Sequence, residues 1–156
     1  MTDAVNRALS AYSQVDLESA VNSASPVQLI ILLYDGAIGA LATAKGQMQE
    51  MKFAEKGRLI SKATGIIEGL RSVLDFERGG DISKNLNDLY EYMKHRLTIA
   101  NLKNDQEGPA EVIRLLNELR SAWADLEGRD RAKAVAEMNK LTQQGQSARE
   151  TVSLRA

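Results

Sequence analysis

Several residue types are scarce in this chain, and each shortage excludes a class of protein. The 156 residues include no cysteine, one histidine and two prolines. Without cysteine the chain forms no disulfide and offers no thiolate to a metal, which suits a reducing compartment. With so few prolines and no runs of β-branched residues, little in the sequence interrupts long helices. These shortages predict an all-α protein.

Long apolar runs are missing as well. The longest uninterrupted one, Leu29–Leu33, is far shorter than a membrane span. The opening MTDAVNRALSAYSQ has no basic region followed by an apolar stretch, so no secretory signal is visible. The net charge of -1 gives no general attraction to nucleic acid. We therefore expect a cytoplasmic protein with no direct membrane insertion and no nucleic-acid partner.

Apolar residues recur at helical spacing in four long segments. In the first, between Val27 and Met51, the steps alternate between three and four residues. It follows Ser25-Pro26-Val27-Gln28, which is typical of an N-cap with a capping box and a proline in the first turn. Because the connections are short, we expect an antiparallel up-down four-helix bundle. The other expected helices span residues 54–76, 81–100 and 109–128, with Gly79-Gly80 ending the second, a polar loop at 101–108 and Gly128 ending the fourth.

The two ends of the chain differ from this central part, so we expect three regions. Residues 1–24 are expected to form a flexible N-terminal segment, and residues 25–128 the bundle. Residues 129–156 hold six basic and three acidic residues, and are expected to form one short fifth helix followed by a disordered basic tail. The weak apolar pattern of the first region consists of Val5, Leu9, Tyr12 and Val15.

Motifs for catalysis and for metal or nucleotide binding are missing. Di-metal sites in four-helix bundles use Glu-x-x-His motifs on two helices, but the one histidine, His95, has Tyr92 three residues before it. Neither common glycine-rich phosphate loop is present. Nothing converges visibly on His95 to form a Ser-His-Asp site. We expect His95 to be a solvated helix residue and the protein to be no enzyme and to use no cofactor.

Other residues suggest a binding surface. Six glycines lie inside the first two helical patterns, although each costs about 1 kcal/mol relative to alanine. They indicate either close helix packing or grooves for another helix. Tyr12 stands in a small and polar stretch, and is either a tether or a removable plug over an apolar groove. Tyr90, Tyr92 and Trp123 are amphipathic anchors of the kind found in binding hot spots, although Trp123 also fits the core. The glycines are Gly36, Gly39, Gly46, Gly57, Gly65 and Gly69.

Five stretches of the sequence form a combined pattern that spans roughly residues 12–126. They are Tyr12-x-x-Val15, Ala24-Ser25-Pro26-x-x-Leu29-Ile30-x-x-Leu33-Tyr34-Asp35-Gly36-Ala37, Leu74-Asp75-x-x-x-Gly79-Gly80-Asp81-Ile82-x-x-Asn85-Leu86-x-x-Leu89-Tyr90-x-Tyr92, Arg96-Leu97-x-x-Ala100-Asn101 and Leu119-Arg120-x-Ala122-Trp123. Taken together, these stretches resemble the flagellin-specific export chaperones of the bacterial flagellum. The combination is specific, while any one stretch alone is weak. The tail from about residue 129 has no matching motif.

The resemblance implies a function as well as a fold. Members of that family bind the disordered C-terminal segment of flagellin in the cytoplasm. This binding prevents premature polymerisation, and the complex then docks on the flagellar export gate. The segment wraps around the bundle, partly as helices in apolar grooves, and an N-terminal tyrosine covers part of that surface when no client is bound. We expect the residues that contact the client or gate to include Tyr12, Leu33, Tyr34, Leu89, Tyr90 and Trp123.

A second function stays open at this point, that of a non-enzymatic structural or regulatory bundle that homodimerises. Its mark would be a continuous apolar seam on two faces of the bundle, buried between two copies. Apolar residues beside the main seam, such as Leu33 and Ile38, fit either function because they widen the apolar face of the first helix.

Overall fold

The computed structural model describes the backbone of residues 25–155 and the side chains of residues 25–144. Three-residue connections join the helices of this part. The prediction of an all-α four-helix bundle is confirmed. The helices are α3 (Pro26–Gln49), α4 (Phe53–Ser72), α5 (Phe76–Lys103) and α6 (Glu107–Arg155).

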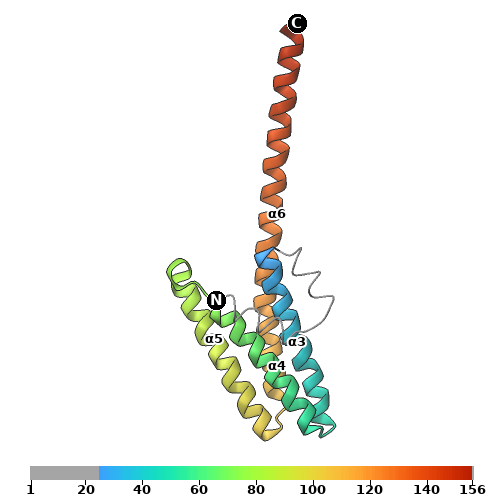
Figure 1. Ribbon diagram of the computed structural model, residues 1–156, viewed down its shortest axis with the longest axis vertical. Coiled ribbons are helices and arrows are strands. Elements are labelled where there is room, and N and C mark those ends of the chain that lie inside the picture. Colours follow the sequence, from blue (N-terminus) through green and yellow to red (C-terminus); the bar gives the residue numbers. More distant parts are fainter. Residues whose placement is uncertain (1–24, 156) are drawn as a thin grey trace.

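Each helix packs against two neighbours, so the four form a closed ring. Both α3 and α5 lie against α4 and α6. Because each connection is short, consecutive helices run in opposite directions (Figure 1). As a result α3 and α6, the first and last of the described helices, are side by side and antiparallel.

The start of α3 agrees with its sequence pattern. Ser25 Oγ accepts a hydrogen bond from the backbone N–H of Gln28 at 3.2 Å, and Gln28 Oε1 accepts one from the backbone N–H of Ser25 at 2.9 Å. This capping box satisfies amides that the first turn leaves free, and Pro26 takes the first helical position. Within residues 25–155, α3 is the one helix long and apolar enough to cross a membrane, but core helices pass the same test. Its buried side packs against α4 and α6.

The core forms where the apolar seams of the four helices meet. The seam predicted for α3 is buried from Tyr34 to Met48, while Ile30 near its start is half-buried. Each fully buried leucine or isoleucine contributes about 2 kcal/mol relative to an exposed one. Core residues that lie on the predicted seams are Tyr34, Ala37, Leu41, Ala44, Met48, Leu59, Ala63, Ile66, Leu70, Met93 and Leu97, with Val112 and Leu116 from α6.

The boundary between α4 and α5 differs from the prediction. α4 ends at Ser72 rather than near Phe76, and the Asp75 side chain starts a new helix. Its carboxylate accepts hydrogen bonds from two amides of the next turn, each at 3.1 Å. Gly79-Gly80 therefore does not end α4. Gly80 instead forms a kink within α5, with a φ of 49° that glycine adopts without a Cβ clash.

The polar loop predicted at residues 101–108 is shorter in the structure. α5 continues until Asn104, whose left-handed conformation ends the helix, and α6 begins at Glu107. Asn104 Nδ2 also donates a hydrogen bond to the Met48 carbonyl at 3.1 Å, which ties this turn to the end of α3. Gly108 allows α6 to approach α5 closely, because a Cβ there would lie 2.3 Å from the Ala100 Cβ.

α6 continues far beyond the end expected at Gly128. It is a single helix to Arg155, so the expected stop, the separate short helix and the disordered tail after it are wrong. An ion pair between Glu127 and Arg131 at 2.9 Å, one turn apart, supports the helix across Gly128. That residues 129–156 act as a unit separate from the bundle stays a prediction. The flexible segment expected at residues 1–24 lies outside the described residues.

Candidate functional site

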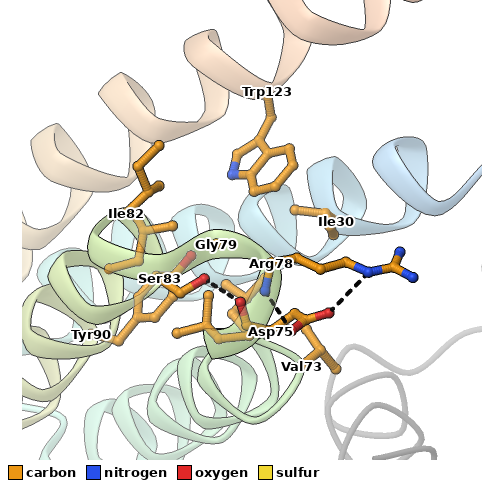
Figure 2. A pocket seen from close by; sticks show the side chains of 12 residues that line it. Ile30, Val73, Asp75, Arg78, Gly79, Ile82, Ser83, Tyr90 and Trp123 are labelled. Carbon is orange, nitrogen blue, oxygen red and sulfur yellow. Dashed lines mark hydrogen bonds and ion pairs between the residues drawn. The ribbon is translucent and has the colours of Figure 1, made fainter.

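An apolar pocket of about 360 Å³ opens where α4 turns into α5. Ile30 of α3 and Trp123 of α6 point into it (Figure 2). The remaining lining comes from the end of α4, the connection after it and the start of α5. These residues are Leu70, Val73, Leu74, Asp75, Arg78, Gly79, Ile82, Ser83, Leu86 and Tyr90.

Two residues that line this pocket, Tyr90 and Trp123, are joined through the buried Tyr34 behind it. The Tyr34 and Tyr90 hydroxyls are hydrogen-bonded to each other, and Trp123 Nε1 donates to the Tyr34 hydroxyl at 3.2 Å. Tyr34 is 0% exposed and Tyr90 2%, whereas Trp123 is half-buried. Burial raises the pKa of both phenols, so they stay protonated near neutral pH. The two tyrosines thus satisfy the polar edge of the indole and hold its ring at the pocket.

The polar groups at the rim are engaged in holding the backbone. Ser83 Oγ donates a hydrogen bond to the Asp75 carbonyl at 2.8 Å, and the Asp75 carboxylate lies 3.8 Å from the Arg78 guanidinium. Gly79 is required beside them, because a Cβ there would lie 1.8 Å from Ser83 Oγ. Ser83 is buried and Arg78 exposed. The pocket therefore offers an apolar surface behind a rim whose main exposed charge is Arg78.

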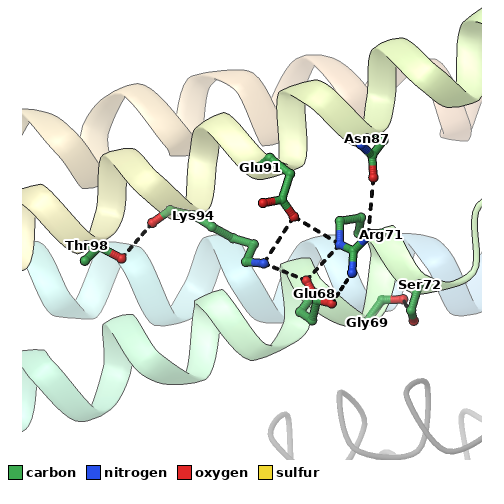
Figure 3. A network of polar contacts seen from close by, with 8 residues as sticks. All are labelled: Glu68, Gly69, Arg71, Ser72, Asn87, Glu91, Lys94 and Thr98. Atoms are coloured by element: carbon green, nitrogen blue, oxygen red, sulfur yellow. Dashed lines mark hydrogen bonds and ion pairs between the residues drawn. The ribbon is translucent and has the colours of Figure 1, made fainter.

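A network of charged side chains joins α4 to α5 (Figure 3). Glu68 accepts hydrogen bonds from Arg71 at 2.5 and 2.9 Å and from Lys94 at 2.7 Å. Glu91 pairs with Arg71 at 3.1 Å and with Lys94 at 3.2 Å. The hydrogen bonds from Arg71, followed by those from Lys94, lower the pKa of Glu68 to about 2. Since these groups are partly exposed, the network aligns the two helices more than it stabilises them.

The side chains of the pocket are better suited to binding another molecule than to catalysing a reaction. The Ser83 hydroxyl and the Asp75 carboxylate already have backbone partners, and His95 is exposed on α5 away from the pocket lining. Within the part that the structure describes, no three His, Cys, Asp or Glu side chains gather as metal ligands would. Ile82, 72% exposed at the pocket edge, adds apolar surface outside it. A concave apolar site of this kind fits the apolar face of a peptide helix.

The structure separates the residues predicted to bind the client or gate. Trp123 and Tyr90 line the pocket, although Tyr90 is 2% exposed. Leu33 and Tyr34 lie in the core at 2% and 0% exposure, and Leu89 is half-buried against it. Of these five, Trp123 is the one that is partly exposed and also lines the pocket. Tyr12, the sixth predicted residue, lies outside the described residues.

Sequence reasoning missed several residues of the pocket edge. The apolar spacing of α5 predicts a core position for Ile82, but the kink at Gly80 turns it outward. Val73 lies in the connection between α4 and α5, and Arg78 in the first turn of α5, whereas the sequence predicted a helix at Val73 and a helix end near Arg78. The one signal for Arg78 and Ile82 was their position within the family-like stretch from Leu74 to Tyr92, and Val73 had none.

The described residues form an all-α bundle with an apolar pocket, and comparison with known proteins identifies its family. The model of the flagellar protein FliS family matches residues 8–130. Over 117 residues the chain is 49% identical to the flagellar secretion chaperone FliSB of Pseudomonas aeruginosa, covering 75% of this chain and 93% of that protein. It is 47% identical over 119 residues to FliS of Salmonella typhimurium, covering 76% and 88%, and 32% identical over 120 residues to FliS of Bacillus subtilis, covering 77% and 86%.

These matches show that the chain belongs to the FliS family of flagellar secretion chaperones. The family resemblance found in the sequence is confirmed. The pocket lies within the matched residues. The part of α6 beyond Gly128, which projects from the bundle as a single helix (Figure 1) and is called the projecting helix below, lies almost wholly outside them.

Proposed function

We propose that this protein is a cytoplasmic export chaperone that binds the disordered C-terminal segment of flagellin, prevents its premature polymerisation and delivers it to the flagellar export gate. The observation that carries the proposal is the apolar pocket beside Trp123, in the part of the chain that matches the FliS family. The names of the relatives, flagellar secretion chaperones, support a role in secretion. The protein acts by binding alone, without catalysis, nucleotide or metal.

The pocket has the properties that such a client requires. A disordered segment loses conformational entropy when it binds, so burial of apolar surface must offset that loss. An amphipathic client helix inserts an apolar side chain beside Trp123 and lays its neighbours over Ile82 and Leu86, which line the same pocket. The hydrogen bond from Trp123 to Tyr34 keeps the indole in place before the client arrives, which lowers the entropy lost on binding.

Calorimetric titration with a synthetic peptide of the flagellin C-terminal segment from the same organism tests the proposal. We expect one-to-one binding at micromolar affinity or tighter, with a negative heat-capacity change from apolar burial. Light scattering on the same samples should give the mass of one chaperone and one peptide. A mass of two chaperones that the peptide leaves unchanged would favour the homodimerising bundle instead.

A pair of variants on α5 locates the binding surface. Ile82→Asp places a charge at the pocket edge, where the residue is 72% exposed, and should weaken peptide binding at least tenfold. Leu102→Asp is the matched control, because Leu102 is 83% exposed at the opposite end of the same helix. Equal affinities of the two variants would place the client elsewhere on the bundle.

Tyr12 acts in this proposal as an exchangeable plug that covers the pocket when no client is bound. Its isolation in a small, polar stretch and its match to the family's N-terminal tyrosine motivate the idea. Tyr12→Ala should change the affinity for the peptide or the gate and leave the helical circular dichroism signal nearly intact. A collapse of thermal stability in this variant would make Tyr12 a structural residue instead.

A further inference from the structure

α6 continues well beyond the bundle that its first half helps to form. The projecting helix leaves the other three helices at the end of the bundle that holds the pocket (Figure 1). Every described side chain from Arg129 to Gln144 is exposed. Most helices in proteins are stabilised by packing an apolar face, and isolated ones are marginal in water. Among the described residues, the projecting helix has no such packing.

The projecting helix keeps the face that α6 turns toward the pocket. An α-helix returns to the same face after about 18 residues, or five turns. Leu141 therefore lies on the same face as Trp123, whose indole points into the pocket (Figure 2). Ala134 and Met138 share this face, two turns and one turn nearer to the bundle. We call Ala134, Met138 and Leu141 the distal stripe.

The distal stripe is an open continuation of the pocket wall. Met138 and Leu141 are 69% and 65% exposed. On the same face, between Trp123 and the stripe, Glu127 and Arg131 neutralise each other in an ion pair at 2.9 Å. Trp123 and Leu141 are roughly 27 Å apart along the helix. A client helix of about 18 residues that leaves the pocket along α6 therefore spans the whole stripe.

Two other occupants of the stripe fit it poorly. Membrane-surface helices present tryptophan, phenylalanine and several leucines, whereas residues 129–156 contain no aromatic residue and the distal stripe has one leucine. A second copy of the helix would bring the same excess of charge, because residues 129–144 hold four basic and two acidic residues, and like charges repel at close range. The client of the pocket, by contrast, lies against this face of α6 already, at Trp123.

We propose that the flagellin segment bound in the pocket continues along the projecting helix as an amphipathic helix and buries the distal stripe. The inference rests on the proposed function and deepens it, because it gives the same client a second contact surface outside the family match. Once the client occupies the pocket, its contact with the stripe is intramolecular. The stripe therefore raises the affinity without any change in the pocket.

Hydrogen exchange of the full-length protein, followed by mass spectrometry, tests the second contact. The probe is a saturating amount of the synthetic flagellin peptide, and calorimetry checks binding on the same samples. In the free protein the amides of residues 129–144 should exchange quickly, because a helix with no packing partner opens readily. With the peptide bound they should become protected, together with the amides near Ile82 at the pocket edge.

Two pairs of substitutions in the full-length protein serve as test and control. Met138→Asp with Leu141→Asp charges the distal stripe, and should weaken peptide binding about tenfold. It should also remove the protection of residues 129–144 while that near Ile82 remains. Ala136→Asp with Gln143→Asp adds the same charges on the opposite face of the helix and should change neither. Equal circular dichroism at 222 nm shows that the helix persists in both variants.

The outcomes separate this inference from the proposed function. A peptide that binds but leaves residues 129–144 unprotected would overturn the inference and leave the proposed function intact. A folded protein that does not bind the peptide would overturn both. Protection already present without peptide would also overturn the inference. A second copy would then occupy the stripe if the protection rises with protein concentration, and another part of this chain if it does not.

Discussion

At the scale of single residues, one buried hydroxyl group links two residues that line the pocket. The Tyr34 hydroxyl bonds to both the Tyr90 hydroxyl and Trp123 Nε1, and Tyr34 is 0% exposed. Without it, two polar groups beside the pocket lose a partner, and leaving a buried donor or acceptor unpaired costs about 1–3 kcal/mol. The position of the tryptophan ring therefore depends on a residue that is itself fully buried.

Substituting this tyrosine should affect stability and binding together. Tyr34→Phe should lower the free energy of unfolding by about 1–3 kcal/mol and broaden the near-ultraviolet signal of Trp123. Tyr90→Phe should cost less, because Tyr34 still accepts the hydrogen bond from the indole. Urea denaturation of both variants measures the difference. Equal losses would mean that the bond from Trp123 contributes little.

The charge on Glu68 should make the free energy of unfolding depend on pH in the acid range. Its pKa is about 2 in the folded protein against an ordinary value of 4.5, so its contribution is present above pH 4.5 and is lost as pH falls toward 2. Glu68→Gln should flatten the fall of the unfolding free energy in this window. Glu118→Gln, at an exposed position of α6, is the control. If the unfolding free energies of Glu68→Gln and of the unsubstituted protein fell equally with pH, the role of the network would be contradicted.

At the scale of the helices, the glycines fall into two groups. Nothing lies within 4 Å of a Cβ built at Gly39, Gly46 or Gly65, and all three are exposed and outside the pocket lining. Neither close packing nor the pocket explains these three. At Gly79 and Gly108, by contrast, a Cβ would clash with a neighbouring side chain. These two glycines permit the turn into α5 and the approach of α6.

Alanine substitutions should therefore have opposite effects at the two kinds of site. Gly65→Ala should raise the free energy of unfolding by about 0.5–1 kcal/mol, because alanine loses less backbone entropy in a helix. Gly79→Ala should lower it by about 1–3 kcal/mol through overpacking against Ser83. Thermal denaturation followed at 222 nm measures both. A loss of stability in Gly65→Ala would show that this position has a partner.

At the scale of the whole molecule, the bundle and the projecting helix differ in what stabilises them. The bundle has a core shared by four helices, whereas the described side chains beyond Gly128 are all exposed. The pocket lies near the point where the two parts meet, since Trp123 lines it five residues before Gly128. The described residues beyond Gly128 contribute neither to the core nor to the pocket lining.

Removal of residues 129–156 should therefore leave the bundle folded. We expect the unfolding free energy of the client-free protein to change by less than about 0.5 kcal/mol, as for exposed positions in general. The helical signal should fall in proportion to the residues removed. A large loss of stability would contradict the separate unit predicted for these residues.

The sequence by itself determined the all-α class, the apolar seams and the start of α3. These follow from local rules, since helical spacing and the Ser25–Gln28 capping box act within a few residues of chain. The family followed from the sequence as well, because its stretches keep their spacing over most of the chain. The prediction that Gly128 ends a helix was wrong, because glycine permits a helix end without requiring one.

Only the tertiary structure decided which apolar residues are buried and which form a site. Leu33 and Tyr34 match the expected motif, but the ring of four helices places them in the core. The pocket exists because the Asp75 cap and the Gly80 kink turn the start of α5 away from α4, beside Trp123 from the far end of the chain. Contacts between segments so distant in sequence depend on how whole helices pack, and local spacing does not encode them.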